Sequence, residues 1–296
     1  MIELAPHHKK GLPIPGPVMT AAGALGYGPE YRDIINFWRS DASPLLGAIV
    51  SSPVSLKPRY VAHPPRMGVR GAQLIIHTGL PNPGLRAVLR MYRDAGMIGP
   101  HRRGFWARQP IPLILHLIAT TPDEMARSCE QVSRVWGVAG IEMGLDDGTS
   151  VDGALVLLEA ALASSDLPII VRVPFDDVDV LAPALAEGGV DALTLAAPPR
   201  GLLPTAILSS DYGHQDKVWV RGRIYGPAVL PLLLARLARW AEKLPVPVIA
   251  CGGIAAPEDA QACLELGAVA VQVDALVWRD PALLECVADQ LMERSN

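Results

Sequence analysis

The sequence predicts an α/β protein that folds as one (β/α)8 barrel of the TIM type, with an inserted segment over its carboxyl-terminal mouth. Eight short apolar runs recur along the 296 residues, and segments with helical spacing lie between most of them. The runs are continuous rather than alternating, which is typical of strands buried on both faces of a parallel sheet. A chain of this length is commonly one barrel, and we find no linker or low-complexity tract. We therefore expect one domain over residues 1–296.

The eight predicted strands share a short, apolar composition rich in branched residues. In chain order they are GAIVSS (47–52), AQLIIH (72–77), PLILHL (112–117), GIEMG (140–144), PIIVRV (168–173), ALTLAA (192–197), PVIAC (247–251) and AVAVQV (268–273). In such a barrel the functional side chains lie at the carboxyl ends of the strands and in the loops that follow them.

Helices are predicted where capping residues, an early proline and first-turn acids precede apolar spacing. The segments are TTPDEMARSCEQVSRVW (120–136), DDVDVLAPALAEGG (176–189), GPAVLPLLLARLARWAEKL (226–244), APEDAQACLELG (256–267) and WRDPALLECVADQLMERS (278–295). The stretch 198–225 is too long for a plain strand-to-helix loop and contains VWVRGRIYG. We expect it to fold over the mouth of the barrel.

Composition excludes several classes of protein. The net charge of −4 and pI near 6.0 argue against nucleic-acid binding. We interpret the basic stretch HRRGFWARQP (101–110) as a solvated loop or a subunit contact. The four cysteines have no C-x-x-C spacing, which argues against a disulfide framework or a metal-cysteine site. Without a signal peptide or a run of about 18 apolar residues, we expect a cytoplasmic protein with no membrane contact.

Several stretches in order resemble the dihydroorotate dehydrogenase family, specifically its soluble class 1. They are PVMTAAGALGYGPEY (17–31), GAIVSSPVSLKPR (47–59), HPPRM (63–67), GLPNPG (79–84), GVDALTLAA (189–197), RGRIYGPAVLP (221–231) and the CGGI and AVQV pair near the end. This resemblance implies FMN at the barrel mouth and oxidation of dihydroorotate to orotate. In the family a base in the strand-4 loop takes a proton while hydride passes to the flavin. The resemblance also suggests a homodimer, and a separate electron-transfer subunit stays open.

Carried over by position, the resemblance implies two sets of site residues. The cofactor-binding set is Ala21, Ala22, Gly23, Ser52, His116, Arg172, Gly226, Gly252, Gly253, Asp274 and Ala275. The catalytic set is Asp147 and Arg172. No metal ligand is expected, because the histidines and aspartates at the strand ends lack metal-binding spacing and are better explained as satisfied polar groups.

The chain departs from the family's motifs at several strand ends. Ser52 stands at a lysine position, Arg172 at another, and Ile76 and His116 stand where side-chain amides are expected. The family's N-x-S-C-P-N loop is here GLDDGT (144–149), which puts Asp147 at the position of the cysteine base. A free carboxylate is less basic than a thiol by about 4.6 pKa units, or roughly 6 kcal/mol. Asp147 is therefore either a base or part of a turn and helix cap.

The paired glycines Gly252 and Gly253 suit a phosphate, whereas Asp274 does not. In the family these glycines and a second glycine turn donate backbone N–H groups to the FMN phosphate, and Asp274 stands at that second glycine. A carboxylate about 4 Å from a phosphate charge costs roughly 4 kcal/mol at an effective dielectric of 20. The alternative role of Asp274 is to cap the last helix.

Two hypotheses follow from these observations. The first is an FMN-dependent oxidoreductase of the dihydroorotate dehydrogenase type whose substrate has changed, so that dihydroorotate is handled poorly. The second is a barrel of the same ancestry that has lost catalysis and acts as a binding or assembly partner. Bound FMN would discriminate between them.

Overall fold

A computed structural model describes most of the chain. The described residues are 1–30, 46–99, 101, 111–208, 215–278, 280 and 282–293. The basic stretch 101–110, interpreted above as a loop or subunit contact, lies outside them apart from residue 101.

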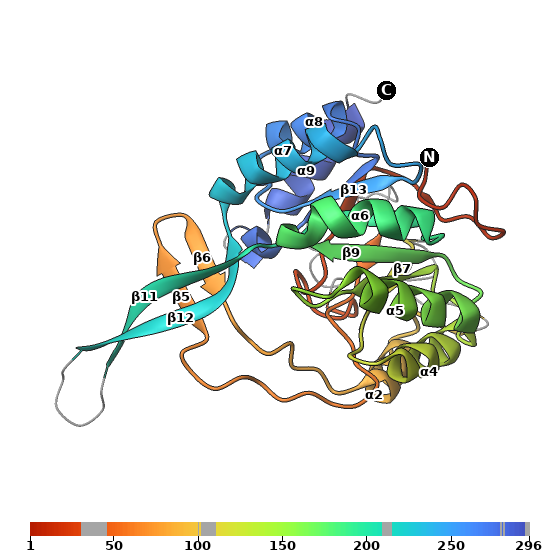
Figure 1. Ribbon diagram of the computed structural model, residues 1–296, viewed down its shortest axis with the longest axis horizontal. Coiled ribbons are helices and arrows are strands. Elements are labelled where there is room, and N and C mark those ends of the chain that lie inside the picture. The colour runs from red at the N-terminus through yellow and green to blue at the C-terminus, as the bar shows by residue number, and fades with distance from the viewer. Residues whose placement is uncertain are drawn as a thin grey trace.

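Eight parallel strands form the barrel, which confirms the predicted fold class (Figure 1). Around the sheet they are β3 (Val18–Thr20), β14 (Ala270–Val273), β13 (Val248–Cys251), β10 (Ala192–Ala197), β9 (Ile169–Pro174), β8 (Gly140–Gly144), β7 (Leu113–Ile118) and β4 (Ile49–Val50). A parallel bridge between Met19 and Ala48 joins the two end strands and closes the ring. The strands are almost wholly buried, as their continuous apolar composition requires.

Helices follow the strands and cover the barrel. They are α2 (Leu85–Asp94), α4 (Pro122–Ser133), α5 (Val151–Ser164), α6 (Val178–Glu187), α7 (Leu230–Trp240), α8 (Pro257–Glu265) and α9 (Ala282–Glu293), with the 3-10 turns η1 (Phe175–Asp177), η2 (Pro227–Val229) and η3 (Ala275–Trp278). The capping expected at 120–136 is present, because the Thr121 side chain accepts from the Glu124 N–H at 3.3 Å and Pro122 opens the helix.

Two apolar layers hold the barrel together. The larger fills the space between the strands and the helices, and the smaller lies inside the barrel. Within the smaller layer the hairpin of β1 (Ile2–Glu3) and β2 (Pro13–Ile14) packs Leu4, Leu12 and Ile14 against inward-facing strand residues. The amino-terminal end of the barrel is thus closed by apolar side chains, which leaves the opposite end for chemistry.

One predicted strand is not in the barrel. The run AQLIIH (72–77) forms β6 (Gln73–Ile76), which belongs to a separate antiparallel sheet of order β11-β12-β6-β5, with β5 (Met67–Arg70), β11 (Arg200–Leu208) and β12 (Gln215–Tyr225). The eighth barrel strand is instead β3. The prediction failed because β3 has three residues within a segment rich in glycine and proline, whereas β6 looks apolar although two of its four residues are only half-buried.

The inserted segment 198–225 forms the β11–β12 hairpin. Pro198, Arg223 and Tyr225 at its base line a cavity at the barrel mouth, as predicted. Its outer part projects away from the barrel beside β5 and β6 (Figure 1). None of the described helices is long and apolar enough to cross a bilayer.

Candidate functional site

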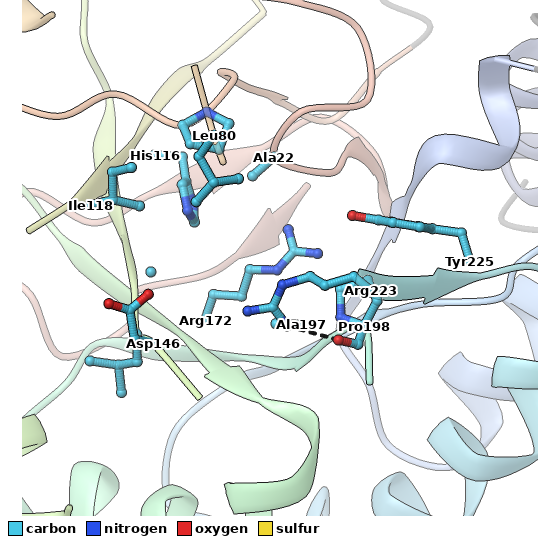
Figure 2. A pocket seen from close by; sticks show the side chains of 13 residues that line it. Ala22, Leu80, His116, Ile118, Asp146, Arg172, Ala197, Pro198, Arg223 and Tyr225 are labelled. Carbon is cyan, nitrogen blue, oxygen red and sulfur yellow. Dashed lines mark hydrogen bonds between the residues drawn. The ribbon is translucent and has the colours of Figure 1, made fainter. Parts of the chain in front are cut away.

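A cavity lies at the carboxyl ends of the barrel strands (Figure 2). Its walls come from the ends of β7 to β10, from the loop after β8 and from β12; the residues are Ala22, Pro53, Leu80, His116, Ile118, Gly144, Leu145, Asp146, Arg172, Ala197, Pro198, Arg223 and Tyr225. Figure 2 shows His116, Asp146, Arg172, Arg223 and Tyr225 directed toward one space. A concave site with a few convergent polar groups is the usual form of a small-molecule site.

Beneath this cavity a fully buried carboxylate organises the floor. Glu142 on β8 accepts from Thr194 Oγ1 at 2.8 Å and Gln272 Nε2 at 2.6 Å, and its other oxygen lies 2.7 Å from His116 Nδ1. Burial opposes ionisation, but the His116 contact and the nearby Arg172 charge lower the pKa of Glu142 to about 2. The barrel interior therefore holds a fixed negative charge under the mouth.

Arg172 on β9 supplies the matching cation. Its guanidinium is buried and lies 3.9 Å from Glu142, 3.1 Å from Cys251 Sγ and 3.4 Å from Gln272 Oε1. Burial raises the pKa of the Cys251 thiol to about 12, so this partner is neutral. The charges of Glu142 and Asp274 both act on Arg172, which also lines the cavity, where it can hold an anionic ligand.

Asp147 joins the loop after β8 to the β11–β12 hairpin through ion pairs. Its carboxylate accepts from Arg200 Nε at 2.5 Å and from Arg223 NH2 at 3.0 Å, and Arg223 also donates to the Pro198 carbonyl at 2.8 Å (Figure 2). Of the described residues, Asp146 rather than Asp147 lines the cavity. Asp147 therefore acts on the mouth through Arg223, which it orients.

A second part of the mouth lies beside β3 and β4. Ala22, Gly23, Ser52 and Trp278 line a pocket that shares Ala22 and Tyr225 with the main cavity. Gly23 has a φ of 84°, which favours glycine at this turn. Ala21 is buried just below, and its N–H donates to the Val273 carbonyl at 2.9 Å. This segment thus presents a surface of small residues onto which a flat ligand could pack.

The paired glycines lie next to this pocket, against the start of α7. A Cβ on Gly253 would fall 2.4 Å from the Leu230 nitrogen, so only glycine fits. The Gly253 N–H donates to Asp274 Oδ2 at 3.3 Å, and Asp274 is buried. Gly226, with a φ of 135°, begins η2 nearby, and Ala275 begins η3 directly after Asp274. The structure therefore joins Gly253 to Asp274 and packs it against the start of α7, with the acid at an amide that the resemblance assigns to a phosphate.

Sequence comparison shows which known proteins this chain is similar to. The chain is 29% identical to a protein of Pelobacter propionicus over 96% of this chain and 90% of that protein, and 28% identical to one of Geobacter metallireducens over 95% and 90%. It is also 29% identical to a protein of Desulforudis audaxviator over 95% and 89%. All three are named dihydroorotate dehydrogenase B (NAD(+)), catalytic subunit.

The chain is thus similar along almost its whole length to catalytic subunits of dihydroorotate dehydrogenase B. No protein-family profile matches it. The strand ends of this chain carry Ser52, Ile76, His116 and the GLDDGT loop, where the motifs of the dihydroorotate dehydrogenases have other residues.

Five of the residues that the resemblance implies line the main cavity or the pocket beside it. Ala22, His116 and Arg172 line the main cavity, and Gly23 and Ser52 the adjoining pocket. Ile76, at the end of β6, lines an outer pocket with Arg59, Arg200 and Arg223. Among the residues that the structure describes, no group of three or more histidine, cysteine, aspartate or glutamate side chains could hold a metal ion.

The sequence did not lead us to predict the buried polar cluster around Glu142 inside the barrel. Glu142, Thr194 and Gln272 each stand as the one polar residue inside a buried strand, in GIEMG, ALTLAA and AVAVQV. The signal was available, because a polar side chain in a strand buried on both faces needs a partner. Arg223 and Tyr225 were missed because they lie on β12, outside the barrel strands.

Proposed function

We propose that this chain is a flavin mononucleotide-dependent oxidoreductase that removes a proton and a hydride from adjacent carbons of a small cyclic substrate. The oxidation of dihydroorotate to orotate, in pyrimidine biosynthesis, is the reference reaction. The observation that carries the proposal is the cavity at the strand ends, which joins the buried cation Arg172 to a small, flat surface at Ala22 and Gly23. The name that these relatives carry, dihydroorotate dehydrogenase B, supports the reaction class.

The inner end of the site fits a flavin ring. Ala22 and Gly23 allow close approach of a planar group, and Arg172 can donate to an electron-rich ring edge. Ser52 adds one hydroxyl where the family has a lysine, so Arg172 supplies the positive charge at this end. Burial raises the pKa of Tyr225 to about 12, which keeps its hydroxyl a neutral donor or acceptor at the mouth.

The loops at Gly226, Gly252 and Gly253 would bind the phosphate of the flavin, but with a loss of affinity. Their positive φ values and the closeness of Gly253 to the start of α7 make a cradle of backbone donors. Asp274 accepts from the Gly253 N–H and brings a carboxylate into the same place. We therefore propose that FMN binds here with lower affinity than the cradle alone would give.

When bound, the flavin would supply the hydride acceptor for the reaction. The chain's own residues would bind and orient the substrate and take up the proton. Arg59, Arg200 and Arg223 line the outer pocket beside Ile76, which favours a small anionic substrate. Asp147 orients Arg223 for this task and stays a candidate for proton transfer, although two guanidinium groups occupy its oxygens.

The assignment of partners is a further part of this proposal. The relatives are named as catalytic subunits. We propose that this chain likewise passes electrons to a separate electron-transfer subunit, and that it forms a homodimer. Its cytoplasmic location stays a prediction.

The purified chain tests this proposal directly. We expect a yellow protein, or a colourless one that binds FMN with measurable heat in calorimetry, whose visible spectrum bleaches with dithionite. Dihydroorotate and related cyclic CH–CH donors should then bleach the spectrum without air. Absence of any heat with FMN would remove the redox function. A flavin that binds but stays oxidised with dihydroorotate would mean a changed substrate.

A further inference from the structure

The proposed reaction needs a group at the mouth that accepts a proton. The position of the family's base holds Asp147, whose carboxylate binds Arg200 and Arg223. His116 offers a second acceptor at the mouth, and it meets the geometric conditions.

His116 is held from below by Glu142. Its Nδ1 lies 2.7 Å from Glu142 Oε1, with both side chains buried, and the other Glu142 oxygen is fixed by Thr194 and Gln272. Because the pKa of Glu142 is lowered to about 2, this carboxylate is an acceptor at neutral pH. Nδ1 must then carry the hydrogen, so in the neutral ring Nε2 has a free lone pair.

The free nitrogen faces the mouth. An ideal Cβ built on Gly144 would fall 2.5 Å from His116 Nε2, so only glycine leaves room beside this atom. His116 and Gly144 both line the cavity, and His116 points into it (Figure 2). The glycine that replaces the family's asparagine therefore opens the side of His116 from which a ligand would approach.

We propose that His116 Nε2, oriented by Glu142, accepts the substrate proton in the proposed reaction, and that Glu142 is its positioning residue. This inference rests on the proposed function. The substrate C–H bond breaks, its proton forms the Nε2–H bond, and its electron pair becomes the new C=C bond. When bound, an oxidised flavin would accept the hydride that the adjacent carbon gives up, and would be reduced by it. The imidazolium so formed is stabilised by Glu142.

The charged groups around His116 come from four elements. Glu142 lies on β8, Asp146 in the loop after it, Arg172 on β9 and Arg223 on β12. Asp146 is the competing base, because its exposed carboxylate also faces the cavity (Figure 2). Removing each of the two groups in turn therefore distinguishes them.

Kinetics of four variants discriminate between these bases. His116→Gln keeps a polar side chain of similar size, and we expect it to lower kcat by about 100-fold or more with KM nearly unchanged and FMN binding retained. Free imidazole should partly rescue His116→Ala. The matched control is His63→Gln, an exposed histidine outside the cavity. If Asp146→Asn abolishes turnover while His116→Gln does not, the inference is overturned.

A spectroscopic measurement tests the geometry without flavin or substrate. In ¹⁵N-histidine NMR of the purified chain, His116 should appear at neutral pH as the tautomer with hydrogen on Nδ1. Glu142→Gln should disturb this tautomer and lower kcat together. A hydrogen on Nε2 in the wild-type chain would overturn the proposal. Lack of FMN binding with the expected tautomer would instead reject the redox function and leave the histidine–glutamate geometry standing.

Discussion

Asp274 is the residue that most affects how a phosphorylated ligand fits this barrel. Its carboxylate lies at the Gly253 N–H, an amide that a phosphate would otherwise use. The sequence suggested either a conflict with phosphate or a helix cap. The carboxylate accepts from the Gly253 N–H, and the Asp274 carbonyl accepts from the Val277 N–H within η3, which is not a cap of the last helix. At the start of that helix, α9, the Asp280 side chain accepts from the Ala282 N–H at 3.0 Å.

Removing the charge of Asp274 should favour the phosphorylated flavin. Asp274→Asn keeps a side-chain oxygen for Gly253 and deletes the repulsion, so affinity for FMN should rise by about 10- to 100-fold. Affinity for riboflavin, which lacks the phosphate, should change little. Calorimetric titration of both flavins measures the ratio. An equal change for both would mean that Asp274 acts through folding.

Glu142 makes stability depend on acidic pH. Its pKa is lowered from 4.5 to about 2 in the folded chain, so its stabilisation is complete above about pH 4.5 and is lost as pH falls toward 2. The shift corresponds to on the order of 3 kcal/mol. Urea unfolding at a series of pH values should show this loss, and Glu142→Gln should flatten the profile over this range.

The control for Glu142 is an exposed carboxylate. Glu130, paired with Arg134 on α4, is about half exposed, so Glu130→Gln should leave the profile almost unchanged. A Glu142→Gln profile as steep as the wild type would show that the acid loss comes from other carboxylates.

The β11–β12 hairpin is the element whose placement depends on one loop residue. Asp147 joins Arg200 and Arg223, which come from the two strands of the hairpin. Breaking both ion pairs releases the base of the hairpin from the loop after β8. The barrel strands, which have their own core, should not be affected.

Asp147→Ala should therefore loosen the hairpin locally. We expect faster hydrogen exchange in β12 near Arg223, equivalent to about 1 kcal/mol of local opening because the pairs are partly exposed. Exchange in β8 and β9 should stay slow. Asp123→Ala, which removes an exposed ion pair to Arg127 on α4, is the control. Uniformly faster exchange across the barrel would contradict a local role.

Closure of the barrel is a property of the whole molecule. The Gly47 N–H donates to the Val18 carbonyl at 2.7 Å, next to the Met19–Ala48 bridge between the first and last strands of the sheet. A Cβ on Gly47 would fall 2.0 Å from the Gly16 carbonyl oxygen, a backbone atom that cannot move aside without opening this joint.

Gly47→Ala should destabilise the entire fold. We expect a loss of more than about 3 kcal/mol in the free energy of unfolding, because backbone must shift at the seam. The matched control is Gly16→Ala, whose Cβ would meet nothing within 4 Å. Denaturant-induced unfolding of both variants provides the comparison. Equal free energies of unfolding for the two variants would refute the claim that the backbone is tightly packed where the barrel closes.

The sequence by itself determined the barrel class and much of the mouth. Seven of the eight apolar runs became barrel strands, because strands buried on both faces need continuous apolar residues. The glycines at 252 and 253 were recognisable because the cradle needs backbone that other residues rarely adopt. The helix cap at Thr121 is likewise local.

Only the tertiary structure decided which polar groups meet. His116, Glu142, Thr194 and Gln272 lie on four different strands, and their hydrogen bonds exist only once the sheet closes. Asp147 likewise finds arginines 53 and 76 residues away. Local pattern fixes how a segment is buried, whereas the partner of a buried charge depends on strand order and register, which no single segment encodes.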